Sequence, residues 1–339
     1  MKVFSTASVR STSTVSLELL KDCVTKLPVD QWLPKRKSRR GRKGFKPKCL
    51  FLAYLLKLKE NIPHDTKLAQ KLRENGTYRK FCGFSKNHTP SHDTISRFNR
   101  ELTSKRLKTI FRKLDELLTR EGIFDHDELA VDATDILSNS RNQHNWDPEA
   151  GYGYKSDGER FHGYWVVYLA GTRSEMVRAV EVTPANIHQS MTVQELFHQI
   201  KGQDLGTATL LIADSAYDDK KTYDKVIKLE LVPLIAYNPK KAKIKSFGKL
   251  KPSNWRKRAI GSEGIQLRKK FYHLRGAVER YQSTIKELLN GRSVPVRGLS
   301  KVKNYLYGLT ILTQFYGLIN WSLLHSIRTP RQLSLDIFL

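Results

Sequence analysis

The spacing of apolar residues changes after Glu121-Gly122, and this change limits the possible folds more than any other feature. Downstream, runs rich in β-branched and aromatic residues alternate with segments of helical spacing; the runs cover residues 161–169, 176–182 and 207–213. Strands that are followed by helices predict a mixed α/β sheet. The sequence therefore predicts an α/β domain that begins near residue 121.

Residues 1–120 show the pattern of several short helices. An apolar helix is expected over residues 49–59, another begins at residue 65 or 66, and a third follows Thr89-Pro90-Ser91. A break at Thr103-Ser104 is expected to divide the last segment into two helices. Short helices with basic flanks are typical of helix-turn-helix modules, so we assign residues 1–120 to a helical DNA-binding region.

The remaining segment, residues 291–339, is expected to form a C-terminal helical extension. Residues 304–324 contain no charged side chain and are long enough to cross a bilayer. However, they include Asn304, Gln314 and Asn320, whose side chains are costly in lipid. A buried core helix is the preferred interpretation, and no membrane association is expected.

The charge balance favours a polyanionic partner. The chain has 60 Lys and Arg residues against 33 Asp and Glu residues, a formal net charge of +27. Nucleic acid is the partner that best offsets such an excess. A basic run at residues 35–43 includes Arg39, Arg40 and Arg42, which we interpret as an arm that contacts DNA phosphates. The alternative is a solvated tail.

A second basic segment, residues 238–270, is predicted to be a linker within the α/β domain, and its only acid is Glu263. We interpret it as a path for the DNA backbone, with a solvated loop as the alternative. Trp255 lies inside this segment, where we hypothesise that it stacks on an unpaired base. The alternative role for Trp255 is a small core anchor.

Three cysteines stand far apart, without a CxxC pair, so neither a zinc knuckle nor a disulfide framework is indicated. Residues 1–14 lack the apolar core of a signal peptide, and we expect a cytoplasmic protein.

Three acidic residues are the candidates for chemistry. Asp132 and Asp214 each follow an apolar run and are expected to close a strand, where sites in α/β sheets are usually built. Glu279 is expected on a helix. Asp135 and Asp218 lie close to the first two and remain alternatives to them.

The segment around Glu279 can be tested as one helix. At about 100° per residue, with Arg275 at zero, Glu279 lies near 40°, Lys286 near 20° and Tyr272 near 60°. These side chains therefore share one stripe, while the apolar residues form a separate face. The expected apolar residues are Val278, Tyr281, Ile285, Leu288 and Leu289.

Carboxylate oxygens are the ligands that Mg²⁺ and Mn²⁺ prefer. Two such ions can activate a nucleophile and stabilise the leaving oxygen in phosphoryl transfer. We therefore expect Asp132, Asp214 and Glu279 to bind two Mg²⁺ or Mn²⁺ ions, with Arg275 and Lys286 on phosphate.

Tyr272-x2-Arg275-x3-Glu279-x6-Lys286 resembles the tyrosine-arginine-glutamate-lysine signature of DDE transposases of insertion-sequence families 4 and 5. Val131-Asp132-Ala133-Thr134 is similar to the segment around that family's first aspartate. Ala213-Asp214-Ser215-Ala216-Tyr217 is similar to the segment around its second aspartate. The resemblance covers residues 40 to 320.

The resemblance implies a ribonuclease-H-like, mixed-sheet catalytic core over residues 121–290, with Asp132, Asp214 and Glu279 as the catalytic triad. It implies cleavage at the terminal inverted repeats of an insertion sequence and joining of the 3′-hydroxyls to target DNA. Tyr272, Arg275 and Lys286 match positions that contact DNA near the cleaved end. The implied partners are double-stranded DNA and a second copy in a synaptic homodimer, on the nucleoid of a bacterium or archaeon.

Two other functions remain open. One is a ribonuclease-H-like endonuclease without strand transfer, and the other is a DNA-binding regulator descended from a transposase. The stretch between Asp214 and Glu279 is short for relatives with a large β-rich insert there, so hairpin formation at the excised end stays open.

Overall fold

In a computed structural model, the protein is described for residues 12–35, 44–140, 146–155, 158–238, 258, 261–288 and 293–324. The chain forms two compact units. Unit 1 comprises Met1–Asp115, Leu288–Asn290 and Lys303–Leu339, and unit 2 comprises Glu116–Glu287 and Gly291–Val302. The C-terminal segment thus groups with the N-terminal helices, whereas the sequence separates them; the functional domain boundaries stay a prediction.

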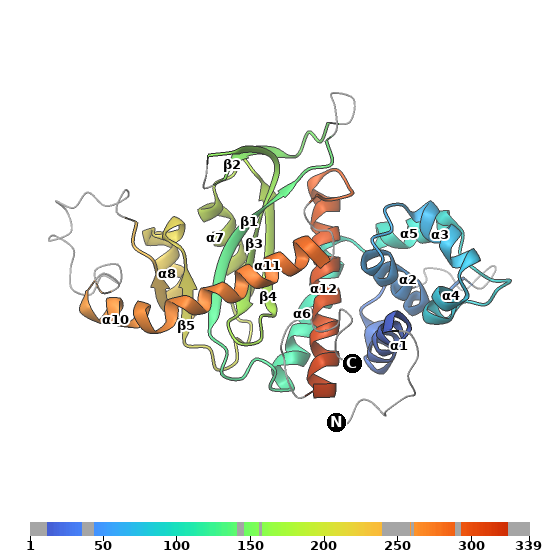
Figure 1. The fold of residues 1–339 in the computed structure, drawn as a ribbon, viewed down its shortest axis with the longest axis horizontal. Helices are drawn as coiled ribbons and strands as arrows, with labels where there is room; N and C mark the ends of the chain where they lie inside the picture. Colours follow the sequence, from blue (N-terminus) through green and yellow to red (C-terminus); the bar gives the residue numbers. More distant parts are fainter. Residues whose placement is uncertain are drawn as a thin grey trace. The chain divides into compact units, whose positions relative to one another are not determined.

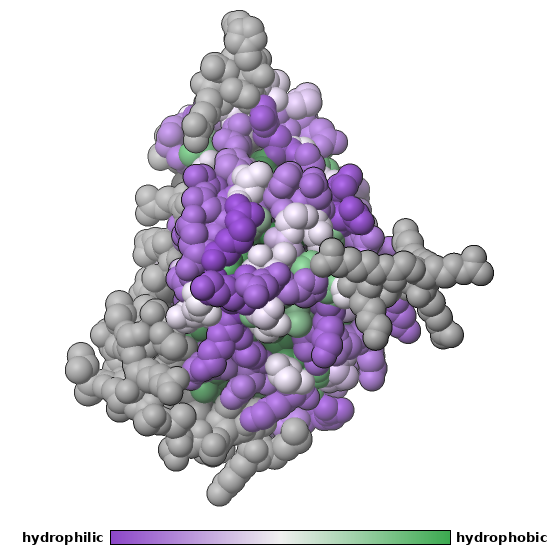
Figure 2. Space-filling model, turned by 90° about the vertical axis from the view of Figure 1, so that its right-hand side faces the viewer, coloured by the Kyte–Doolittle hydropathy of each residue, from purple (hydrophilic) through white to green (hydrophobic). Residues whose placement is uncertain are grey.

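Unit 1 is helical, as its sequence predicts. Its N-terminal helices are α1 (Thr12–Lys26), η1 (Val29–Gln31), α2 (Pro47–Lys59), α3 (Asp65–Glu74), α4 (Gly76–Cys82), α5 (His92–Glu101) and the first part of α6 (Ser104–Arg120), which continues into unit 2. Helix α5 begins where expected, because the Ser91 hydroxyl accepts a hydrogen bond from the Thr94 backbone N–H at 3.3 Å. The predicted break at Thr103-Ser104 is confirmed. The side that holds α3, α4 and α5 in Figure 1 faces the viewer in Figure 2, and its surface is mostly hydrophilic.

Helix α12 (Leu299–Leu324) supplies the buried C-terminal helix that the sequence predicts. Its central residues are almost fully buried, and the Tyr54 hydroxyl of α2 donates to the Asn304 carbonyl at 3.1 Å. Gly308 allows this close approach, because a Cβ there would lie 2.1 Å from the Tyr54 hydroxyl. Among the described residues, none of the helices combines the length and apolar character needed to cross a membrane.

Unit 2 contains a six-stranded mixed sheet (Figure 1). Its strands are β1 (Leu129–Leu137), β2 (Gly151–Tyr154), β3 (Arg160–Gly171), β4 (Val177–Pro184), β5 (Leu210–Ala213) and β6 (Val232–Ile235). The order is β2-β3-β1-β5-β6, and β4 also pairs with β3. Strand β3 is antiparallel to β1, β2 and β4, whereas β5 is parallel to both β1 and β6. The predicted mixed α/β sheet is confirmed.

Alternation along the strands divides the sheet into two faces. One face carries Leu129, Val131, Leu211 and Ala213, which form a core with α7 (Gln189–Ile200) and α8 (Lys220–Lys228). Helix α11 (Gly276–Leu288) crosses the other face in Figure 1. This second face therefore carries the residues of β1 and β5 that alternate with the core.

Three sequence expectations need correction. Strand β1 continues five residues beyond Asp132, so Asp132 lies inside the strand and does not close it. Strand β2 was not expected, because its Gly-Tyr-Gly-Tyr sequence has no β-branched residue. The end of the basic segment is not a linker but part of helix α10 (Ser262–Phe271), and the turn η5 (Tyr272–Arg275) separates it from α11.

Candidate active site

Two of the three candidate acids lie where β1 and β5 separate. The last parallel pair between these strands is Val131 with Ala213, and the next residues are Asp132 and Asp214. Because side chains alternate along a strand, Asp132 and Asp214 both point away from the α7–α8 core. Asp214 directly follows β5, as predicted, and its Oδ1 accepts the Ser215 backbone N–H at 2.5 Å.

The segment after α10 brings Glu279 and its neighbours to these acids. Arg275 ends the turn η5, and its guanidinium contacts Asp132 Oδ2 at 3.4 Å and Glu279 Oε1 at 2.6 Å. The Tyr272 hydroxyl donates to Asp214 Oδ1 over a long 3.5 Å. Arg275 therefore lies between two of the candidate acids, and Tyr272 contacts the third.

The single-helix expectation is wrong at its start. Tyr272 and Arg275 belong to the 3₁₀ turn η5, and only Glu279 and Lys286 lie on α11. A 3₁₀ turn has about three residues per turn, so it rotates Tyr272 and Arg275 relative to the α-helical stripe. The apolar face of α11 is confirmed for Val278, Tyr281 and Ile285, which are buried.

The electrostatics of the site depend on burial and on converging charges. Burial raises the pKa of Asp132 to about 6; Arg275 opposes this shift, and the charges of Glu279 and Asp214 add to it. Burial alone lowers the pKa of Arg275, but the neighbouring acids, Asp132 foremost, outweigh it and raise that pKa. Asp132 is 18% exposed, whereas Glu279 is 50% exposed. The site thus gathers negative charge around one guanidinium at a partly open surface.

Lys286 and Asp135 form a second ion pair on the same helix and strand. Lys286 Nζ lies 2.9 Å from Asp135 Oδ1. The sequence offers Asp135 as an alternative to Asp132 but gives no sign of this pairing, since Asp135 and Lys286 lie 151 positions apart. The alternative Asp218 is buried, and its Oδ2 accepts the Asn238 backbone N–H at 2.9 Å.

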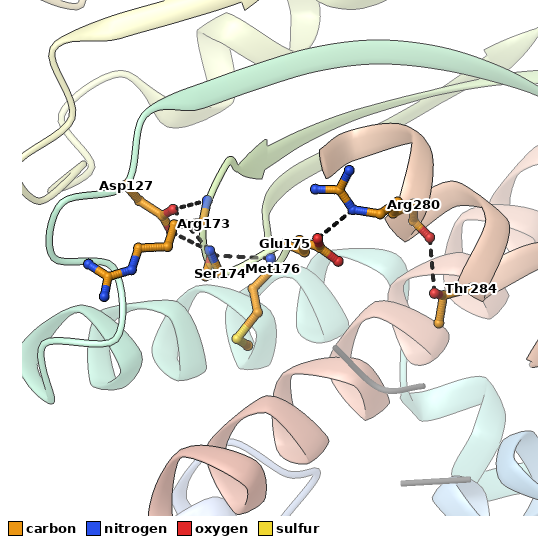
Figure 3. A network of polar contacts seen from close by, with 7 residues as sticks. All are labelled: Asp127, Arg173, Ser174, Glu175, Met176, Arg280 and Thr284. Atoms are coloured by element: carbon orange, nitrogen blue, oxygen red, sulfur yellow. Dashed lines mark hydrogen bonds and ion pairs between the residues drawn. The ribbon is translucent and has the colours of Figure 1, made fainter. Parts of the chain in front are cut away.

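A polar network fastens α11 to the turn between β3 and β4 (Figure 3). Arg280 directly follows Glu279 on α11, and its Nε lies 2.5 Å from Glu175 Oε1. Asp127 holds this β3–β4 turn, because its Oδ1 accepts the Ser174 backbone N–H at 3.0 Å. Glu175 adopts a φ of 53°, a left-handed conformation that this network sustains. The network therefore sets the position of Glu279 over the sheet.

Four predicted DNA contacts, Arg39, Arg40, Arg42 and Trp255, lie outside the described residues. Their roles stay predictions.

The donor set at the site suits a divalent cation. Asp132, Asp214 and Glu279 offer only carboxylate oxygens, the ligands of hard ions; burial raises the pKa of Asp132, and the charges of Glu279 and Asp214 add to that rise. Within the described ranges, no group of three or more His, Cys, Asp or Glu side chains is placed so that it could hold a metal ion. The residues fit a divalent ion by chemistry and charge, and Arg275 provides the positive charge among them.

Comparison with protein families identifies the class of protein. Residues 123–315, more than half of the chain, match the family described as Transposase DDE domain, and the chain belongs to this family. Residues 9–101 match the family described as Transposase domain (DUF772). No curated protein matches the chain. The chain is thus a transposase by family, and both matched families agree on this class.

Two solved structures are similar to the chain at low identity. A cryo-EM structure of the piggyBac transposase synaptic complex with hairpin DNA is 12% identical, with a TM-score of 0.47. The match covers 89% of this chain and 74% of the piggyBac chain. A Mos1 transposase paired-end complex with left transposon end is 11% identical, with a TM-score of 0.20. The match covers 76% of this chain and 83% of the Mos1 chain.

Proposed function

We propose that this transposase binds the terminal inverted repeats of an insertion sequence, cleaves DNA at its ends and joins the 3′-hydroxyls to target DNA. The observation that carries the proposal is the placement of Asp132 and Glu279 on either side of Arg275, with Asp214 next to Asp132 where β1 and β5 separate. The sheet order and the mixed strand directions support a ribonuclease-H-like core. The family membership of the chain supports this chemistry.

Each residue then has a role. Asp132, Asp214 and Glu279 would hold two Mg²⁺ or Mn²⁺ ions, which supply nucleophile activation and charge stabilisation during phosphoryl transfer. Arg275 and Lys286 place positive charge beside the acids and would bind the phosphates that flank the reacting one. Tyr272 orients the Asp214 carboxylate through its hydroxyl.

The remaining parts of the proposal concern partners. The helices of unit 1 and the basic arm with Arg39, Arg40 and Arg42 would bind double-stranded DNA through its phosphates. Trp255 would stack on a base near the cleaved end, and two copies would hold two element ends in a homodimer. The setting is the nucleoid in the cytoplasm of a bacterium or archaeon.

The test is a cleavage and joining assay on duplexes that carry the inverted repeats flanking the gene. Wild-type protein should nick and join these ends with Mg²⁺ or Mn²⁺. Glu279→Gln, Asp132→Asn and Asp214→Asn should each lose several orders of magnitude in rate, while DNA affinity in gel shifts is unchanged or higher. Double variants should be hardly slower than single ones, because the acids act as one unit.

Matched controls come from exposed acids on the helices of the opposite face, Glu195→Gln on α7 and Asp224→Asn on α8. Both should keep full activity. Full activity of Glu279→Gln would contradict the triad. Nicking without joining would favour the endonuclease, and binding without metal-dependent nicking would favour the regulator.

A further inference from the structure

Exposed aromatic side chains gather at the end of the sheet where β2 joins β3. Trp146 stacks on His162 with ring centroids 4.0 Å apart, and Tyr152 lies 4.9 Å from the same histidine ring. Trp146 and Tyr152 are 44% and 43% exposed, which is unusual for such large rings. We call Trp146, Tyr152 and His162 the aromatic platform.

The platform is held in place from below. The Ser138 hydroxyl lies 2.8 Å from His162 Nδ1, and the Ser138 backbone N–H donates to the His162 carbonyl at 3.1 Å. Burial lowers the pKa of His162, which favours the uncharged ring. The guanidinium of Arg160 lies 3.8 Å from the centroid of the Tyr152 ring. The rings are therefore held by neighbouring groups, and the Arg160 cation lies over one face of the Tyr152 ring.

The platform lies on the same face of the sheet as the candidate acids. Asp132 pairs with Tyr168 across β1 and β3, and His162 pairs with Tyr152 across β3 and β2. Tyr168 and His162 are six positions apart on one strand, an even number, so they share a face. The Tyr168 ring contacts Tyr281 of α11 with centroids 5.2 Å apart, which confirms that α11 covers this face.

Five to six residues of strand separate Asp132 from the platform, or roughly 20 Å at about 3.4 Å per residue. A DNA strand whose phosphate lies at the acids would therefore run roughly 20 Å along this face to reach the platform.

We propose that the aromatic platform of Trp146, Tyr152 and His162 is a stacking site for an unpaired nucleobase of the DNA strand that crosses the acid site. Every base has a flat face that stacks on such rings, and the neighbouring Arg160 favours the adjoining phosphate. The net charge of +27 favours DNA over an apolar protein as the occupant. The inference rests on the proposed function for the direction of the strand, and on the ring cluster for the stacking itself.

The experiment compares two single-stranded probes of equal length and charge with the full-length protein. One probe is a 12-nucleotide oligothymidylate, and the other has the same backbone with abasic sugars. Fluorescence anisotropy measures both dissociation constants. Wild-type protein should prefer the base-containing probe, and Trp146→Ala or Tyr152→Ala should reduce that preference by about 5- to 150-fold, without weakening binding of the abasic probe.

Trp146→Phe keeps a ring and should keep most of the preference. Met191→Ala removes an exposed apolar side chain from α7 on the other face and should change nothing. Equal binding of both probes by the wild type, or an unchanged preference in both alanine variants, would overturn the platform. Cleavage of element ends is measured in a separate assay. If the alanine variants lose the base preference but the wild type never cleaves, the platform is supported and the transposase mechanism is rejected.

Discussion

At the scale of single residues, the ionised Asp132 carboxylate lowers the free energy of unfolding at neutral pH. Its pKa is about 6 in the folded protein, against an ordinary value of 3.8, because burial disfavours the carboxylate. The folded protein therefore holds this proton more tightly than the unfolded chain. The resulting stabilisation is complete below pH 3.8 and disappears as the pH rises through about 6.

Asp132→Asn should consequently stabilise the metal-free protein at neutral pH. The shift of about two pKa units corresponds to roughly 3 kcal/mol at most, since each unit is worth about 1.4 kcal/mol. Thermal melts should show a higher Tm for the variant at pH 7.5 and almost none of that gain at pH 4. Asp224→Asn on α8 is the control, and a gain for Asp132→Asn that does not depend on pH would refute this account.

Divalent ions should restore the stability that the clustered acids remove from the folded protein. If Asp132, Asp214 and Glu279 hold Mg²⁺ or Mn²⁺, the ion binds only the folded chain and stabilises it by about 2.7 kcal/mol at a concentration of 100 Kd. The Tm of wild-type protein should rise with added Mn²⁺ and fall back with EDTA. Glu279→Gln should lose most of this rise, whereas Glu195→Gln should retain it. An equal rise in both variants would place the metal elsewhere.

At the scale of elements, patterns with a local cause were predictable. The helix after Ser91, the break at Thr103-Ser104 and strand β5 depend on capping, turn residues and apolar runs that the sequence displays. Long-range causes were not predictable. Strand β1 extends to Leu137 because β3 pairs with its whole length, and the Gly-Tyr-Gly-Tyr strand exists only because β3 offers it an edge.

The same limit applies to the candidate site. The spacing of Glu279 and Lys286 on α11 follows from helical periodicity, and the sequence indicates it. The 3₁₀ turn that carries Tyr272 and Arg275 does not follow from local pattern, and neither does the pairing of Lys286 with Asp135. The aromatic platform was also missed, because Trp146, Tyr152 and His162 meet only once β2 and β3 have paired.

A substitution at Gly163 tests how closely β1, β2 and β3 pack where they meet. A Cβ at this position would lie 2.1 Å from the Ile136 carbonyl oxygen, and backbone cannot move aside cheaply. Gly163→Ala should therefore destabilise the protein by about 1–3 kcal/mol and weaken the base preference of the platform. Gly44→Ala is the control, because a Cβ at Gly44 meets nothing within 4 Å. An unchanged denaturation midpoint for Gly163→Ala would contradict the described junction.

At the scale of the whole molecule, the excess of positive charge determines how DNA binding responds to salt. The net charge of +27 means that binding releases many counterions from DNA. The logarithm of the affinity should fall linearly with the logarithm of the salt concentration, by about 0.9 per neutralised phosphate. The steepness of this line counts the phosphate contacts made by the full chain.

The basic arm should account for a defined part of that slope. Replacing Lys37, Arg39, Arg40 and Arg42 together by Gln removes up to four phosphate contacts, so the slope should become shallower by up to about 3.6. Gel shifts on one duplex between low and moderate salt measure the change. The matched control removes four charges elsewhere, with Lys201, Lys220, Lys221 and Lys228 replaced by Gln, and should alter the slope much less. An arm variant with the wild-type slope would show that residues 35–43 remain solvated in the complex, because only charges that displace counterions from DNA contribute to the salt dependence.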